Sequence, residues 1–101
     1  MNPIWVGRFD VTGPKDNVML EGNAGAWIWI AAQAEDSEKL QLRVESAMRD
    51  LGLQVNDKED VQEVVNEDDL SEGVRKLIPE ARRNVESVVC GTLHRYKTHD
   101  A

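Results

Sequence analysis

A row of polar side chains near the C-terminus is the part of this sequence best suited to chemistry. Side chains alternate between two faces in an extended strand, so a strand over residues 85–97 would place four of them together: Cys90, Thr92, His94 and Tyr96. Histidine can serve as a base beside a cysteine nucleophile or a tyrosine acid. Cys90 and His94 would nevertheless lie about 13 Å apart along the strand, too far for His94 to activate the thiol. The row therefore favours an ordinary surface over an active site, and we predict no catalytic residues.

A run of acidic residues in the middle of the chain is the second feature. Residues 57–72 contain one base and eight acids, which are Asp57, Glu59, Asp60, Glu63, Glu67, Asp68, Asp69 and Glu72. This window carries −7, equal to the net charge of the whole chain. It lacks the glycine and the regularly spaced ligands of a calcium-binding loop. The segment indicates either a solvated face that aids solubility or a contact surface for a basic protein partner.

Composition excludes several classes of function. The chain has 101 residues, which is typical of one domain over 1–101, with residues 97–101 expected as a flexible tail. One cysteine cannot form an internal disulfide, which favours the cytoplasm. No apolar run is long enough to cross a membrane, and the acidic balance argues against nucleic-acid binding. No spacing of histidine, cysteine or glycine indicates a metal, a phosphate or another cofactor, and we predict none.

The periodicity of apolar residues predicts six elements in the order β-β-α-β-α-β. Two strands, 4–11 and 26–34, flank a long loop; a helix capped by Asp36 or Ser37 ends at Gly52; a short strand covers about 61–66. A second helix around 70–83 is interrupted at Pro79, and the last strand spans 85–97. This order predicts an α+β two-layer sandwich, a mainly antiparallel sheet of about four strands with both helices on one face. We expect a variant of the ferredoxin-like fold.

The second strand raises a question about what covers it. Its sequence AWIWIAAQA, residues 26–34, is apolar at eight of nine positions, so both of its faces need cover. If the helices lie over Ile28 and Ile30, the opposite face would gather Trp5, Phe9, Trp27, Trp29, His94 and Tyr96. Such a face would pair two copies of the chain, or bind a partner or a ligand. Alternatively, the Trp rings lie under the helices or under the loop at 18–20, and a bulge at Gly7 or Gly91 would reverse part of a strand.

Two classes of function fit these patterns. The first is a non-enzymatic protein-interaction module, homodimeric through the aromatic face, that binds its partner through the acidic segment. Small acidic inhibitor, immunity or regulatory proteins act in this way. The alternative is a dimeric ferredoxin-like domain that binds a small ligand, or catalyses a reaction, on the face that carries Trp27, Trp29, His94 and Tyr96.

Overall fold

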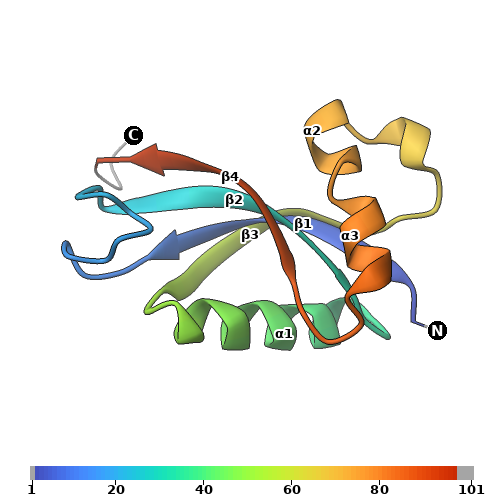
Figure 1. Cartoon of the computed structure of the whole chain (residues 1–101), viewed down its shortest axis with the longest axis horizontal. Coiled ribbons are helices and arrows are strands. Elements are labelled where there is room, and N and C mark those ends of the chain that lie inside the picture. The colour runs from blue at the N-terminus through green and yellow to red at the C-terminus, as the bar shows by residue number, and fades with distance from the viewer. Residues whose placement is uncertain (1, 98–101) are drawn as a thin grey trace.

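The computed structural model of the protein describes residues 2–97 and shows an α+β fold built on one four-stranded antiparallel sheet (Figure 1). The strands lie in the order β3-β1-β2-β4, and each neighbouring pair is antiparallel. Along the chain the elements are β1 (Ile4–Thr12), β2 (Gly25–Gln33), α1 (Ser37–Asp50), β3 (Gln54–Glu63), the 3-10 turn η1 (Glu67–Asp69), α2 (Glu72–Arg75), α3 (Ile78–Arg83) and β4 (Val89–Tyr96). The predicted element order is confirmed, with the second helix split in two. Of the expected tail only Lys97 lies within the described residues.

Helix α1 begins and ends where its capping residues predict. The Asp36 carboxylate accepts a hydrogen bond of 2.8 Å from the backbone N–H of Lys39, which satisfies a donor that has no partner inside the helix. At the other end Gly52 adopts a positive φ of 76°. The N–H groups of Gly52 and Leu53 then donate to the carbonyls of Arg49 (3.0 Å) and Met48 (2.8 Å). This pair of bonds is a Schellman motif.

Helix α1 covers one face of the sheet. The core beneath it contains Phe9, Val11, Leu20, Ala26, Ile28, Ile30, Ala32, Ala34, Leu40, Val44, Met48 and Leu53. The predicted packing of the α1 stripe on Ile28 and Ile30 is confirmed. The expected position of Trp5 and Phe9 is wrong: Phe9 is 0% exposed in this core, and Trp5 packs against it and donates from Nε1 to the Ala34 carbonyl at 3.1 Å. Phe9 pairs directly with Ile28, and direct cross-strand partners share a face.

Helices α2 and α3 lie on the opposite face, as Figure 1 shows. Our expectation of both helical segments on one face is therefore wrong. Ser71 caps α2 by accepting from the Val74 N–H, and Pro79 stands in the first turn of α3, where its missing N–H costs nothing. Together the two helices form a second core with strand residues, made of Val6, Ala31, Leu70, Val74, Leu77, Ile78 and Ala81. A ferredoxin-like arrangement is not confirmed, because strand order and helix placement both differ from it.

The two helical layers explain the unbroken apolar run of β2. Ile28, Ile30 and Ala32 belong to the core under α1, whereas Ala31 belongs to the core under α2 and α3. Trp29 also packs against this second core. A strand buried on both faces needs apolar residues at successive positions, so the chain itself supplies most of the cover that this sequence requires.

The loop between β1 and β2 is fastened to the end of α1. The Asn17 side chain donates from Nδ2 to the carbonyls of Leu51 (2.8 Å) and Gly52 (3.3 Å). Leu20 is fully buried in the core under α1, whereas Val18 is 84% exposed. The loop therefore caps the helix and closes the core, which accounts for apolar residues at 19 and 20 in a segment rich in turn formers.

The third and fourth strands form the two edges of the sheet. Strand β3 is longer than the expected 61–66 and begins at Gln54, while β4 begins at Val89 rather than Val85. β3 contains two register shifts against β1, and Asp60 within it has a positive φ of 53°. Strand β4 contains one shift against β2, between Cys90 and Leu93. These bulges decide which side chains of the edge strands reach each face.

Candidate functional site

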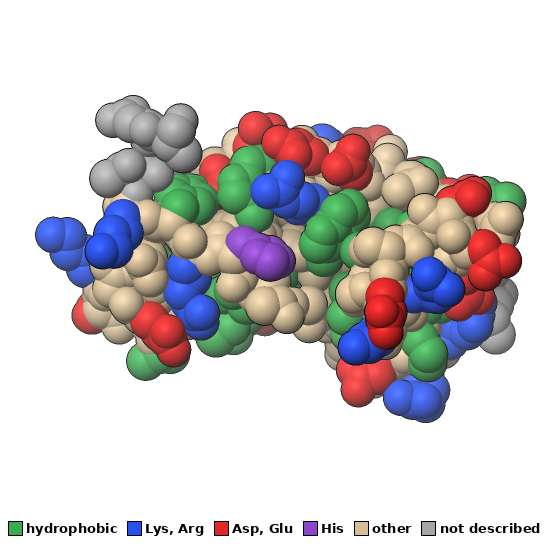
Figure 2. Space-filling view, turned by 90° about the horizontal axis from the view of Figure 1, so that it is seen from above, with side chains coloured by type: hydrophobic (Ala, Val, Ile, Leu, Met, Phe, Trp, Pro, Cys, Tyr) green, Lys and Arg blue, Asp and Glu red, His purple; other side chains and the backbone are tan. Residues whose placement is uncertain are grey.

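Part of the second face of the sheet is left uncovered by α2 and α3. The helices pack over the end that carries Val6, Ala31 and Val89. The register places the remaining side chains of that face side by side on three strands: Arg8 and Asp10 of β1, Trp27 and Trp29 of β2, and His94 and Tyr96 of β4. We call this surface the open face. Figure 2 looks onto it and shows hydrophobic side chains at the surface beside basic ones, with acidic side chains along one edge.

Arg8 lies between an aromatic ring and a carboxylate. Its Cζ atom is 4.6 Å from the centroid of the Trp27 ring, within the range of a cation–π contact. Its Nη1 donates to the Glu59 carboxylate of β3 at 2.8 Å. These two partners, one on each neighbouring strand, fix the position of the Arg8 side chain. Trp27 and Trp29 are each only half-buried, so Arg8 and the two indole rings form a partly apolar surface that is open to solvent.

Tyr96 is fixed to Asp10 across the open face. The Tyr96 hydroxyl donates to Oδ1 of Asp10, whose residue is only 8% exposed. Burial raises the pKa of Tyr96, and the hydrogen bond and the charge of Asp10 raise it further. Gly25 makes room for this arrangement, because a Cβ there would lie 2.5 Å from the Tyr96 oxygen. The hydroxyl thus stays protonated near neutral pH and is a poor candidate for a base or a nucleophile.

The expected polar row on the last strand is broken by the bulge in β4. His94 pairs with Trp27 and lies on the open face, whereas Cys90 pairs with Ile30 and so lies on the α1 side of the sheet. The prediction that Cys90 shares a face with His94 and Tyr96 is therefore wrong. Desolvation raises the pKa of the Cys90 thiol, which lowers its thiolate fraction and its nucleophilicity. No group of three or more metal-binding side chains occurs within residues 2–97.

The acidic residues lie along the β3 edge of the sheet, in the 3-10 turn η1 and at the start of α2. Asp57, Glu59, Asp60 and Glu63 lie on β3, Glu67, Asp68 and Asp69 form η1, and Glu72 opens α2. Asp57 pairs with Asp10, and Glu59 with Arg8, so these two carboxylates border the open face. Among the described residues only two of the eight acids form ion pairs, Glu59 with Arg8 and Glu67 with Arg82 (2.6 Å). The other six leave a net negative rim.

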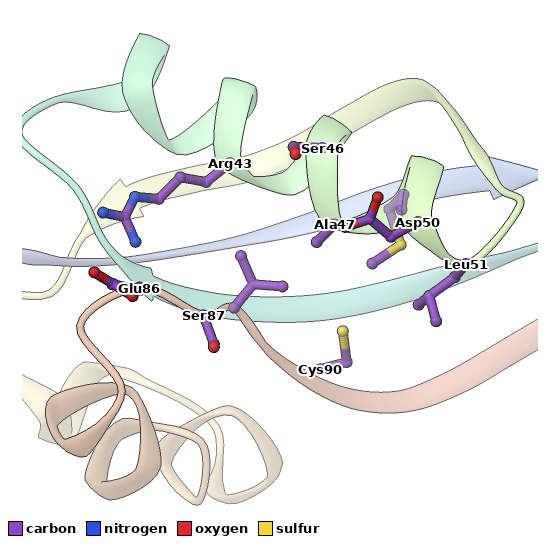
Figure 3. Close-up of a pocket in the computed structure, with 10 residues that line it drawn as sticks. Arg43, Ser46, Ala47, Asp50, Leu51, Glu86, Ser87 and Cys90 are labelled. Atoms are coloured by element: carbon purple, nitrogen blue, oxygen red, sulfur yellow. The ribbon is translucent and has the colours of Figure 1, made fainter.

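A cleft on the other side of the sheet was not foreseen from the sequence. It has a volume of about 430 Å³ and lies between α1 and the start of β4. Figure 3 shows Cys90 and Leu51 beside this space, with Arg43 and Glu86 at one end. Arg43 donates from Nη1 to the Val85 carbonyl at 2.6 Å. The cleft exists because α1 packs mainly over β3 and covers little of the start of β4, which no local sequence pattern reveals.

Comparison with known proteins gives no relative: no protein-family model, curated protein or solved structure matches the chain. The function is therefore argued from the geometry of the open face and its acidic rim.

Proposed function

We propose that this protein is a non-enzymatic interaction module that binds a basic protein partner through the open face and its acidic rim. The observation that carries the proposal is that Arg8 of β1 connects the partly exposed rings of β2 to the carboxylates of β3, through its contacts with Trp27 and with Glu59. Tryptophan and arginine dominate the energetic centres of protein interfaces. Charged residues around such a centre mainly speed association and select the partner.

The chemistry of the face favours binding over catalysis. Tyr96 and Asp10 satisfy each other, and Arg8 is engaged by Trp27 and Glu59. These contacts hold the surface in one conformation before a partner arrives, which lowers the entropy cost of binding. The alternative of a small-ligand or enzymatic site on this face has less support. The pKa of the Tyr96 hydroxyl is raised, so this group is a poor base or nucleophile.

The acidic rim sets the expected chemistry of the partner. Asp57 and Glu59 flank the face, and the carboxylates of Asp68 and Asp69 in η1 continue the negative charge toward α2. A partner with lysine or arginine around an apolar contact would match both the charge and the rings. Pairing of two copies through the open face has less support, since Trp5 and Phe9, which were expected on this face, lie in the core instead.

Two substitutions with a matched control test the proposal. A partner captured from the source cell is purified, and its association and dissociation rates are measured at low and at physiological salt. Trp27→Ala should weaken affinity by tenfold or more, mainly through faster dissociation, as removal of a central aromatic residue costs about 2 kcal/mol or more. Asp57→Asn should slow association at low salt with little change in dissociation. Asp16→Asn, in the loop between β1 and β2, removes the same charge and should change neither rate.

The proposal fails if the purified partner binds folded Trp27→Ala and Asp57→Asn as tightly as the unaltered protein. It fails as well if Asp16→Asn slows association as much as Asp57→Asn does. The association rate would then depend on the net charge of the protein and not on the position of the acidic rim.

A further inference from the structure

The two edge strands of the sheet differ in how they are protected against pairing. Strand β3 carries four acidic residues, contains two register shifts, and has Asp60 at a positive φ. Charges and bulges of this kind are the features that block an edge from adding another strand. Strand β4, with the sequence VCGTLHRY, has one register shift and one arginine, but it contains no acidic residue and no proline. No strand within residues 2–97 pairs with its outer edge. Of the two edges, β4 is therefore the less protected.

The geometry points to a second copy of this chain as the occupant of that edge: we propose that two molecules pair antiparallel through β4 and form one continuous eight-stranded sheet. A two-fold axis beside β4 places β4 of one copy antiparallel to β4 of the second copy, so the two strands can pair directly. The axis is perpendicular to the sheet, so the open faces of both copies lie on the same side. The proposal is independent of which protein the open face binds.

The distribution of charge favours this pairing over pairing through β3. Each chain carries −7, and the acidic segment accounts for all of it. With β4 at the centre of the dimer, the two β3 edges lie at its ends, seven strand spacings or about 34 Å apart. Charges at that distance are screened, because the Debye length at physiological salt is about 8 Å. Pairing through β3 would instead place acidic residues against acidic residues.

The cleft between α1 and β4 supplies apolar surface for the same interface. Leu51 is 43% exposed at its border, and Val88 and Cys90 line it from the sheet side. Figure 3 shows Leu51 and Cys90 on the two sides of this space. A strand of the second copy placed beside β4 would extend the sheet next to the cleft. It would remove part of the apolar surface of Leu51, Val88 and Cys90 from water, which stabilises association.

The mass of the protein in solution tests the pairing. Sedimentation velocity at micromolar concentration should give twice the chain mass of 11.4 kDa and a fall toward one chain mass on dilution. Thr92 is exposed and lies near the middle of β4, so a pair centred on this strand brings the two copies of residue 92 close together. Thr92→Glu should therefore weaken self-association by about tenfold or more through repulsion of like charges. Thr92→Lys should do the same with the opposite charge. Gln62→Glu introduces the same side chain on the β3 edge and should leave the dimer intact.

Hydrogen exchange of the backbone locates the interface independently of any variant. Amides of β4 should be protected at high protein concentration and exchange faster on dilution, while those of β3 should not change. A protein that stays monomeric over the whole concentration range overturns the proposal. So does a dimer that Trp29→Glu dissociates while both Thr92 variants leave it intact, because the copies would then pair through the open face.

Discussion

Gln33 joins β2 to the end of α3 and makes the placement of the α2–α3 layer testable. Its side chain is 1% exposed, and Nε2 donates to the carbonyls of Ala81 (3.0 Å) and Arg82 (3.1 Å). Its Oε1 is buried without a partner among the described residues. Gln33→Glu is nearly isosteric but replaces the donating amide by a carboxylate that faces two carbonyl oxygens. The substitution therefore changes charge and hydrogen bonding while the shape of the core is retained.

The expected loss of stability follows from these contacts. Two hydrogen bonds are worth about 0.5–1.5 kcal/mol each, and a buried carboxylate without a partner costs several kcal/mol more. We expect the free energy of unfolding at neutral pH to fall by about 3–5 kcal/mol, a large part of the 5–15 kcal/mol typical of a domain. Burial raises the pKa of the introduced carboxyl. Its penalty is complete above that raised pKa and shrinks as the pH falls toward about 4.3, the value in the unfolded chain.

Urea unfolding followed by tryptophan fluorescence, at neutral and at mildly acidic pH, measures both effects. Gln62→Glu makes the same chemical change at an exposed site on β3 and should cost less than about 0.5 kcal/mol at either pH. Gln33→Met removes the hydrogen bonds without adding charge and serves if Gln33→Glu does not fold. A loss below about 1 kcal/mol for Gln33→Glu, or a loss that does not depend on pH, would refute the packing of α3 on β2 described here.

Three further predictions concern the cores, the open face and the loop. Leu40→Ala and Ile78→Ala should each lower the free energy of unfolding in urea by about 2–5 kcal/mol, one for each face of the sheet; a change below about 0.5 kcal/mol for Ile78→Ala would contradict the second core. Because the pKa of Tyr96 is raised on folding above its ordinary value of 10.0, its stabilising contribution is complete below that value and is lost as the pH rises above it. Thermal unfolding should show this alkaline loss in the unaltered protein and less of it in Tyr96→Phe. Asn17→Ala removes the side-chain bonds to the end of α1 and should cost about 1 kcal/mol in urea unfolding; an unchanged midpoint would show that the loop does not cap the helix.

The acidic segment shows how far a pattern of charge can be interpreted without coordinates. The sequence established the number of carboxylates and their closeness along the chain. It did not predict that four of them lie on an edge strand, because QVNDKEDVQE has only two apolar residues and lacks the alternation of a half-buried strand. Neighbours across β1 hold this strand in the sheet despite its composition, and that support is tertiary.

The sequence by itself determined the elements whose signals are local. The Asp36 cap, the apolar stripe of α1 and the left-handed Gly52 all follow from residues within a few turns of one another. The double cover of β2 also follows, since an unbroken apolar run must be buried on both faces.

Only the tertiary structure decided which face each side chain joins. Alternation places Trp5 on the same face as Phe9, and Trp27 on the same face as Trp29. It does not show which of the two faces of the sheet each pair joins, because that depends on the register between the strands. The same ambiguity applies to α2 and α3, whose apolar stripe fits either side of the sheet. The bulge between Cys90 and Leu93 separated Cys90 from His94. Register, side and bulge are each set by contacts between residues far apart in the chain, and for that reason the open face emerged only from the fold.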